Sequence, residues 1–273
     1  MGAPGSGKQR LPGVVNDLYN MNDYLQSPRG GAWYANEIEI LDNPSTWDVQ
    51  DAINNAIADY VFIYFSGHGF MDEWKNNLVC FKDYNVIDCN LFNPVSPRQL
   101  IIIDACRCYL PTISGIPGEV EKWQYADGYS EARELFDRYI LGTGPGRMIL
   151  HSTTEGEFAY DERNGRGGEF TLALLQCLFA EKTASGYYPV SVSRALDNTK
   201  KSLREANEPQ LPCITFHDGN FEVPLAIVSA NFIPFAEIER PQYITSRPKA
   251  NSSSSDGLVL AAIAGLILWG LSD

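Results

Sequence analysis

The chain lacks an excess of basic residues. Its 273 residues include 21 Lys and Arg against 34 Asp and Glu, which gives a formal net charge of −13, and the isoelectric point is near 4.7. A protein that binds nucleic acid by electrostatic attraction neutralises phosphates with Lys and Arg, so this class of function is disfavoured. The charge balance instead favours partners and substrates that carry positive charge.

The chain also lacks an opening hydrophobic signal segment and any Cys-x-x-Cys pair. Without a signal segment the expected compartment is the reducing cytoplasm, where disulfides are rare. Cys106 and Cys108 form a Cys-x-Cys pair, which is not the spacing of a structural zinc site. The remaining cysteines stand at 80, 89, 177 and 213. We therefore expect no disulfide framework, no metal site and no cofactor, and nothing in the sequence indicates activation by calcium.

What the chain does have is the composition and pattern of an α/β domain. Apolar residues make up 44% and charged residues 20%, which is typical of a globular protein of one large or two small domains. Apolar runs alternate with amphipathic stretches, as in folds with a largely parallel sheet. Two uninterrupted runs, 60–65 and 100–103, predict strands covered on both faces. Further strands are predicted over 37–41, 78–81, 148–150 and 213–216, and helices over 14–25, 45–57, 130–140, 168–180 and 190–206.

Each of the two strongest predicted strands ends on a reactive residue. His68 follows the first strand and Cys106 follows the second. Because the carboxyl ends of parallel strands meet at one edge of the sheet, both side chains should emerge there. An imidazole beside a thiol can stabilise the thiolate and later protonate a leaving amine. The backbone N–H groups of Gly69 and Cys106 could hold a developing oxyanion. This is the equipment of a cysteine peptidase.

The motifs around these residues resemble those of the caspase-like cysteine peptidases, a group that includes caspases, metacaspases and bacterial orthocaspases. The resemblance rests on Tyr64-Phe-Ser-Gly-His-Gly69 and Ile103-Asp-Ala-Cys-Arg107. Further agreement comes from Leu11-Pro-Gly-Val-Val-Asn-Asp17, from Ser152-Thr-Thr154 and from Gly168-Glu-Phe-Thr171. The likeness covers roughly residues 5–220 and is closest to bacterial metacaspase-like proteins.

The resemblance implies a three-layer sandwich, with a mostly parallel central sheet and helices on both faces. It implies a peptidase domain over 1–235, in which a large-subunit part (about 1–110) and a small-subunit part (about 147–235) flank a linker (about 111–146). It also implies that Cys106 is the nucleophile and His68 the general acid and base, in an endopeptidase activated by self-processing or a regulatory signal in cell death or defence. Self-cleavage would fall after a basic residue in or beside the linker, namely Lys122, Arg133, Arg138 or Arg147.

The same resemblance bears on specificity. Caspases that cleave after Asp have Gln two residues before the cysteine, where this chain has Asp104. Metacaspase-like enzymes bind Arg or Lys of their protein substrates through acidic and hydroxyl groups, and the matching positions are Asp17, Ser66 and Asp104. Carboxylates in a partly desolvated pocket suit a guanidinium group. An alternative for Asp17 is a helix-start residue that stabilises the helix dipole.

The chain departs from the resemblance at its beginning. The first strand of the family is central and ends just before a Gly-containing loop, whereas Met1-Gly2 stands directly in that loop. Either residues upstream of Met1 supply this strand, or the sheet is incomplete and stability and activity are reduced.

Two other function classes remain open. Gly2-Ala-Pro-Gly-Ser-Gly-Lys8 is close to a phosphate-binding loop, and Ile101-Ile-Ile-Asp104 is similar to the magnesium-binding strand of nucleotide hydrolases. However, Gln9 stands where Ser or Thr is needed, and Pro12 interrupts the helix that should start at once. The other class is an inactive caspase-like module that only binds partners, which the retention of both Cys106 and His68 argues against.

The end of the chain differs from the rest. Residues 236–256 have the composition of a linker, and Gly257–Leu271 is apolar and uncharged. We expect a membrane anchor that leaves the peptidase on the cytoplasmic side, since Arg240, Arg247 and Lys249 precede it. As a helix the run spans only about 22 Å at ~1.5 Å per residue, short of the ~30 Å hydrocarbon core. A buried terminal helix or a segment that forms homo-oligomers is therefore the alternative.

Overall fold

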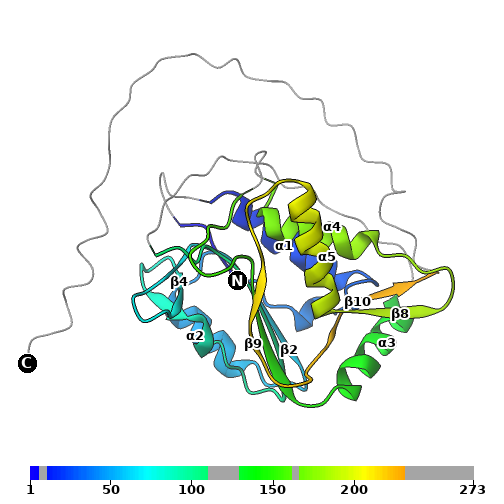
Figure 1. Ribbon diagram of the computed structural model, residues 1–273. Coiled ribbons are helices and arrows are strands. Elements are labelled where there is room, and N and C mark those ends of the chain that lie inside the picture. The colour runs from blue at the N-terminus through cyan, green and yellow to red at the C-terminus, as the bar shows by residue number, and fades with distance from the viewer. Residues whose placement is uncertain (6–10, 110–128, 162–165, 231–273) are drawn as a thin grey trace, which may run out of the picture. The chain divides into compact units, whose positions relative to one another are not determined.

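A five-stranded sheet forms the centre of the fold (Figure 1). The computed structural model describes residues 1–5, 11–109, 129–161 and 166–230. The strand order is β1-β2-β6-β7-β9, and only β9 runs antiparallel to its neighbour. The five strands are β1 (Gly2–Ala3), β2 (Val61–Gly67), β6 (Arg98–Asp104), β7 (Gly146–His151) and β9 (Cys213–His217). The predicted α/β fold with a mostly parallel sheet is confirmed.

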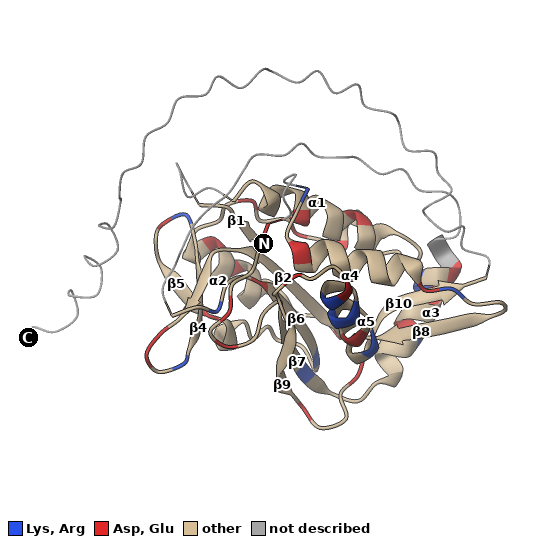
Figure 2. Cartoon of the chain, turned by 45° about the horizontal axis from the view of Figure 1, so that its top comes forward, with Lys and Arg blue, Asp and Glu red and all other residues tan. Residues whose placement is uncertain are grey.

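Helices and two small sheets cover the central sheet. The helices are α1 (Gly13–Gln26), α2 (Thr46–Asn55), α3 (Tyr129–Gly142), α4 (Glu169–Ala180) and α5 (Val192–Glu205), with 3-10 turns η2 (Ala35–Glu37) and η3 (Cys89–Leu91). One small sheet joins β3 (Gly69–Met71), β4 (Asn77–Cys80) and β5 (Val86–Asp88). The other pairs β8 (Tyr187–Ser191) with β10 (Pro224–Ser229). Figure 2 shows that α5 carries several Lys and Arg residues, drawn in blue.

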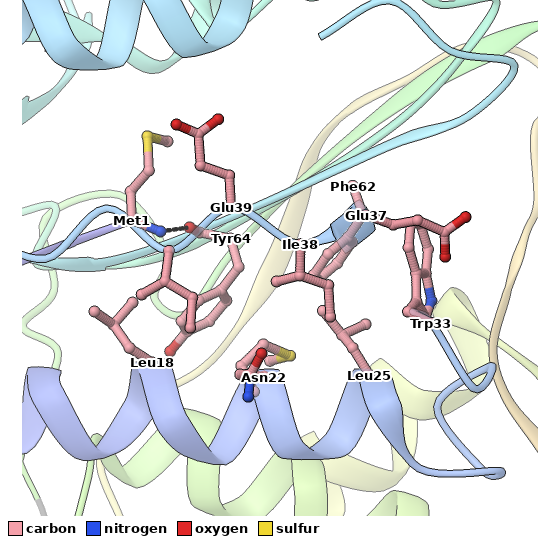
Figure 3. Close-up of a pocket in the computed structure, with 12 residues that line it drawn as sticks. Met1, Leu18, Asn22, Leu25, Trp33, Glu37, Ile38, Glu39, Phe62 and Tyr64 are labelled. Carbon is pink, nitrogen blue, oxygen red and sulfur yellow. Dashed lines mark hydrogen bonds between the residues drawn. The ribbon is translucent and has the colours of Figure 1, made fainter. Parts of the chain in front are cut away.

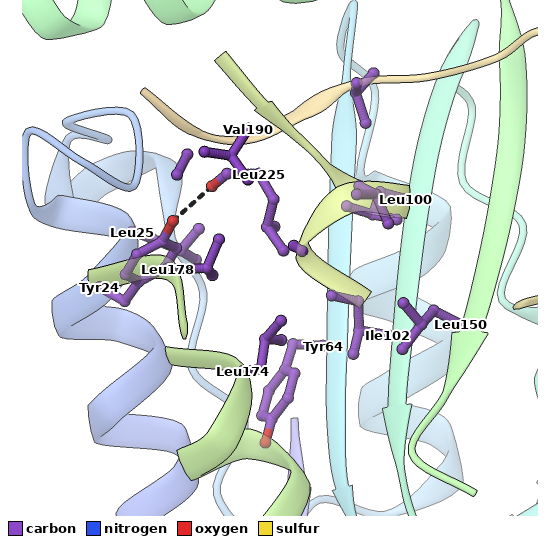
Figure 4. Packing of buried hydrophobic residues seen from close by; sticks show 14 of the residues in the cluster. Tyr24, Leu25, Tyr64, Leu100, Ile102, Leu150, Leu174, Leu178, Val190 and Leu225 are labelled. Carbon is purple, nitrogen blue, oxygen red and sulfur yellow. Dashed lines mark hydrogen bonds between the residues drawn. The ribbon is translucent and has the colours of Figure 1, made fainter. Parts of the chain in front are cut away.

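The central strands separate two hydrophobic cores, because successive side chains of a strand point to opposite faces. Tyr64, Ile102 and Leu150 belong to the core that packs against α1, α4 and the β8–β10 pair (Figure 4). Phe65, Ile101 and Ile103 belong to the core beneath α2 and the β3–β5 sheet. The run Leu100–Ile103 is at most 1% exposed, which explains why it shows no polar alternation.

The helix predictions for the amino-terminal half are largely confirmed. Val14, Leu18, Met21 and Leu25 form the buried face of α1. Ser45 is the N-cap of α2, where its Oγ accepts a hydrogen bond from the backbone N–H of Asp48 and the Asp48 carboxylate accepts from the N–H of Ser45. The helix ends at Asn55, two residues before the end predicted near Ile57. Ile57 is 72% exposed.

The predicted strand over 37–41 is also wrong. The turn η2 ends at Glu37, and the following residues form no regular strand. Ile38 packs at the edge of the core, while Ile40 is 43% exposed. A strand needs a partner that satisfies its backbone groups, and among the described strands only β1 bonds to this segment, through Gly2 N–H to the Leu41 carbonyl at its end.

The proposed processing positions have different surroundings from those expected of an exposed linker. Arg133 and Arg138 lie within α3, where Arg133 forms ion pairs with Glu37 and Asp137. Arg147 lies in β7, where its guanidinium donates to the carbonyls of Asn90 and Phe92. Lys122 lies outside the described residues, as does the whole tail beyond residue 230. In the part of the chain that is described, no helix has the length and apolar character needed to cross a membrane.

Candidate active site

The register between β2 and β6 brings the two candidate catalytic residues to the same edge of the sheet. Ser66 stands opposite Asp104 at the carboxyl ends of these parallel strands. His68 and Cys106 each follow two residues later. The sheet edge expected from the sequence therefore exists, and both residues are half-buried there.

Gly69 packs directly against the cysteine loop. A Cβ placed on it would lie 2.8 Å from the Cβ of Ala105 and 2.9 Å from the carbonyl oxygen of Cys106. Only glycine fits such a close approach of two backbones. The contact is extended by Met71, whose N–H donates to the Cys108 carbonyl at 3.0 Å. The segment that follows His68 is thus held against the segment that carries Cys106.

The Cys106 thiol contacts the loop that follows β7. The backbone N–H of Ala159 donates to Cys106 Sγ at 3.3 Å, and Sγ lies 3.5 Å from the Ala159 carbonyl oxygen. Burial raises the pKa of this thiol to about 11, partly offset by the hydrogen bond from Ala159. At neutral pH the resting side chain is therefore a thiol rather than a thiolate, and a base must remove its proton before it can attack.

Arg107 forms hydrogen bonds that hold the cysteine loop, residues 105–109 after β6, against neighbouring segments. The sequence analysis assigned Arg107 no role. Its guanidinium is buried and donates to Asn77 Oδ1 at 2.7 Å and to the Thr153 carbonyl at 3.1 Å. Its backbone N–H donates to the Glu157 carbonyl, and its carbonyl accepts from Gly156 N–H. These bonds connect β4, the cysteine loop and the loop that contacts Cys106.

The three predicted pocket residues do come together beside this edge. Asp17 lies on α1, with Oδ2 accepting from Ser66 Oγ at 2.7 Å and Oδ1 accepting from Gly168 N–H at 2.8 Å. Asp104 Oδ2 accepts from Thr171 Oγ1 at 2.6 Å. The alternative role for Asp17 is wrong, because it is the fifth residue of α1 and its carboxylate bonds to groups outside that helix.

A third carboxylate, Asp161, joins this group and was missed by the sequence analysis. Its Oδ1 lies 3.0 Å from the position of a Cβ on Gly13, and Gly13 N–H donates to it. Its Oδ2 is buried with no hydrogen-bond partner among the described residues. Asp161 follows no predicted strand, so nothing distinguishes it in the sequence from other acidic loop residues.

Gly168 lies between the carboxylates and has no room for a side chain. A Cβ on it would stand 2.6 Å from Asp104 Oδ2 and 3.3 Å from Asp17 Oδ2. The neighbouring Gly167 has a φ of +149° and the same close approach to Asp17. In the sequence, this pair of glycines is the signal that the backbone approaches the Asp17 and Asp104 carboxylates closely.

The acidic cluster of Asp17, Asp104 and Asp161 has no ion-pair partner among the described residues. Burial, followed by the neighbouring Asp104 carboxylate, raises the pKa of Asp17 and raises that of Asp161 to about 6. Burial also raises the pKa of Asp104. Such a cluster would be stabilised by a cation placed among its oxygens.

Comparison with known proteins decides the family. The sequence model of the caspase domain matches residues 5–222, which is most of the chain and includes every candidate site residue named in this subsection. The chain belongs to the caspase-domain family. It is therefore related to cysteine-type peptidases, which are hydrolases that act on protein substrates.

The structure also disfavours the alternative of a phosphate-binding loop at 2–8. Such a loop needs a helix that begins directly after its Lys, whereas α1 begins only at Gly13.

The caspase fold is supported independently by a solved structure. The crystal structure of caspase-1 from Spodoptera frugiperda matches with a TM-score of 0.52 over 85% of this chain and 90% of the other. The two sequences are 13% identical, so this likeness concerns the fold alone. No curated protein matches the chain. In this caspase-domain chain no described group of three or more His, Cys, Asp or Glu side chains is arranged to hold a metal ion.

Proposed function

We propose that this caspase-domain protein is a cysteine endopeptidase that cleaves protein substrates after Arg, and less readily after Lys, by means of Cys106 and His68. One observation carries the proposal. The buried carboxylates of Asp17 and Asp104 and the half-buried carboxylate of Asp161 converge beside the strand end that leads to Cys106, without a cationic partner among the described residues.

The pocket chemistry favours a guanidinium over an ammonium group. Arg offers five N–H donors in a planar fork, so it can bond to more than one carboxylate at once. Asp161 Oδ2 is a buried acceptor with no partner among the described residues. A Lys ammonium would neutralise charge but has only three donors on a point charge. An Asp side chain in the same place would add a fourth carboxylate, which like-charge repulsion strongly disfavours.

The proposed reaction has two stages. The Cys106 Sγ–H proton passes to His68 as Sγ attacks the scissile carbonyl carbon, forming a carbon–sulfur bond and a tetrahedral oxyanion. His68 then gives the proton to the leaving amine as the peptide carbon–nitrogen bond breaks, which leaves a thioester. In the second stage His68 takes a proton from water as the water oxygen attacks the thioester carbon. The carbon–sulfur bond then breaks, and His68 returns the proton to Sγ, which releases the acid product and restores the thiol.

The backbone around Cys106 is suited to assist these steps. We propose that the N–H groups of Gly69 and Cys106 donate to the oxyanion, since the two backbones are in close contact. The loop at Ala159 would have to release Sγ before attack, because its N–H and carbonyl occupy the space beside the thiol.

The biological setting is a further part of the proposal. A cytoplasmic peptidase tethered to a membrane through 257–271, and activated by self-cleavage or a regulatory signal, agrees with the sequence of the tail and with the family. Of the expected processing positions, Lys122 is the one favoured, since Arg133, Arg138 and Arg147 lie in α3 and β7. No cofactor is proposed, and calcium dependence would be tested by chelation.

Matched fluorogenic peptides that differ only in the residue before the scissile bond test this function. We expect turnover after Arg, slower turnover after Lys and negligible turnover after Asp. Cys106→Ala and His68→Ala should each lower kcat by orders of magnitude, because nucleophile and base act as a unit. Cys177→Ala, a change to a half-buried cysteine on α4, is the matched control. Full activity in Cys106→Ala, or a preference for Asp, would contradict the proposal.

A further inference from the structure

The segment 152–161 after β7, which we call the contact loop, carries two parts of the proposed site. The backbone of Ala159 contacts Cys106 Sγ through both its N–H and its carbonyl. Asp161, at the end of the loop, supplies the third carboxylate of the acidic cluster. The groups that hold this loop in place therefore bear on both the nucleophile and the pocket.

The other two carboxylates of the cluster stand on a packed frame. Asp17 lies on α1 and Asp104 lies on β6, which pairs with β2. Figure 3 shows Leu18 of α1 next to Tyr64 of β2, and both side chains belong to one buried cluster. The contact loop belongs to no helix or strand, so the position of Asp161 depends on the side chains that anchor the loop.

Gln210 joins the two ends of the contact loop. This side chain is 2% exposed. Its Nε2 donates to the Ser152 carbonyl at 3.1 Å, and its Oε1 accepts from Tyr160 N–H at 3.3 Å. Ser152 is itself fixed to the sheet, because its N–H donates to the Ile103 carbonyl at 2.9 Å. Gln210 thus connects the far end of the loop to the sheet.

The bond from Tyr160 N–H orients the peptide group that contacts the nucleophile. This peptide is trans, and in a trans peptide the N–H and the carbonyl point in opposite directions. Because Tyr160 N–H faces Gln210, the carbonyl of the same peptide faces the other way. This carbonyl belongs to Ala159 and lies 3.5 Å from Cys106 Sγ. The position of the Gln210 amide therefore determines which backbone group the thiol meets.

The next peptide group leads to Asp161 and is fixed from the other side. The Tyr160 carbonyl accepts from the N–H of Glu169, the first residue of α4, at 2.8 Å. Asp161 then forms an isolated antiparallel bridge with Gly168. With its N–H held by Gln210 and its carbonyl held by α4, Tyr160 directs the following residue into the acidic cluster.

The middle of the contact loop is held in a different way. Glu155 pairs with Lys75 Nζ at 3.0 Å and accepts from the Tyr109 hydroxyl at 2.5 Å. These side chains are exposed, and exposed ion pairs contribute little to stability. The bonds of Gln210 are buried, where an unpaired donor or acceptor is costly. Gln210 is therefore the stronger anchor of the two.

The sequence around Gln210 suits a fixed anchor. It lies between Pro209 and Pro212, in the connection that leads from α5 to β9. Proline fixes its own φ and restricts the residue before it, so this backbone has little freedom. A Gln amide also offers a donor and an acceptor on one side chain, which the two ends of the loop require.

On the basis of the function proposed above, we propose that Gln210 is a positioning residue of the peptidase. It orients the 159–160 peptide against Cys106 and places Asp161 for the selection of Arg over Lys. It acts through the backbone of the contact loop.

Replacing Gln210 with Met in the full chain tests this role, because Met has a similar length but forms neither bond. We expect hydrogen exchange at the Tyr160 amide to become about tenfold faster or more, and alkylation of Cys106 by iodoacetamide to become about threefold faster or more. For peptide substrates, kcat/KM after Arg should fall about tenfold or more. The ratio of kcat/KM after Arg to that after Lys should fall about threefold or more.

Gln99→Met is the matched control. Gln99 is also buried, and its Nε2 donates to the carbonyls of Pro94 and Ser96 near the amino end of β6. This change should leave the exchange of the Tyr160 amide and the Arg-to-Lys ratio as they are. Equal effects of the two changes would overturn the proposal, because they would show a general loss of stability. Unchanged exchange and an unchanged ratio in Gln210→Met would also overturn it.

A second variant, Gln210→Glu, keeps an oxygen that can accept from Tyr160 N–H. It should retain most of the protection of the Tyr160 amide, and a loss as large as that in Gln210→Met would count against the proposed bond. Exchange and alkylation by iodoacetamide do not require peptidase activity. If the original chain fails to cleave Arg peptides, the proposed function is wrong, and these two rates alone decide whether Gln210 positions the loop: faster rates in Gln210→Met support it, and unchanged rates overturn it.

Discussion

Replacing Asp161 with Asn should stabilise the folded chain while weakening its proposed action on Arg substrates. The change removes a carboxylate that burial and Asp104 disfavour in its charged form, and it keeps an oxygen that can accept from Gly13 N–H. With a folded pKa of about 6 against an ordinary value of 3.8, the charged form costs up to about 3 kcal/mol of unfolding free energy.

The sign of this effect gives it a characteristic pH dependence. The folded chain binds the Asp161 proton more tightly than the unfolded chain does, so this group destabilises the fold as pH rises. The cost is absent below about pH 4, develops between about pH 4 and 6, and is complete above that. Asp161→Asn should therefore match the original chain at pH 4 and exceed it at pH 8 by about 6–12 °C in Tm.

Thermal unfolding of both chains from pH 4 to 8 provides the assay. Asp51→Asn, at an exposed position on α2, is the matched control and should give no such rise. In parallel, kcat/KM for an Arg peptide should fall at pH 8. A Tm difference that is independent of pH, or an Asp161→Asn chain that is less stable at pH 8, would refute the reasoning.

Two further changes test neighbouring parts of the account. Thr171→Val removes the hydroxyl that donates to Asp104 at 2.6 Å, and kcat/KM for an Arg peptide should fall about tenfold or more. The acidic limb of the pH profile of kcat/KM should move to higher pH, because the lost bond favours the charged carboxylate. An unshifted profile would contradict this role. Ser45→Ala removes the N-cap of α2 and should lower the free energy of unfolding by ~1 kcal/mol, seen as a Tm decrease of about 2–4 °C. Because α2 holds no proposed site residue, kcat/KM should be unchanged, and a large loss of activity would contradict the placement of the site away from α2.

The strands that carry the proposed catalytic residues could be predicted because their sequence is unambiguous. Leu100–Ile103 is apolar without interruption and stops at Asp104, which is the behaviour of a strand buried on both faces. The same logic located the end of β2 before His68. The register that places Ser66 opposite Asp104 was not predicted and is seen only in the structure.

Elements whose structure depends on distant partners were the ones that sequence reasoning missed. The segment 37–41 has the alternation of a strand, but among the described strands it is bonded only by β1, at Leu41, so local pattern and structure disagree. The surroundings of Asp161 are set by Gly13 and Asp104, which lie on separate parts of the chain, so its place in the acidic cluster could not be predicted locally. The strand β10, in contrast, is fully buried and is apolar up to its last residue, Ser229. Its short run after a turn did not distinguish it from a loop.

The most direct test of the central claim is the covalent labelling of Cys106 by a peptide chloromethyl ketone that carries Arg next to the reactive group. Mass spectrometry of the intact chain and of its peptides should find one adduct, on Cys106, formed much faster than with the matching Asp reagent. The Cys106→Ala chain should take up none at the same rate. Labelling of other cysteines at equal rates, or faster reaction with the Asp reagent, would contradict the account of a Cys106 peptidase with an acidic pocket.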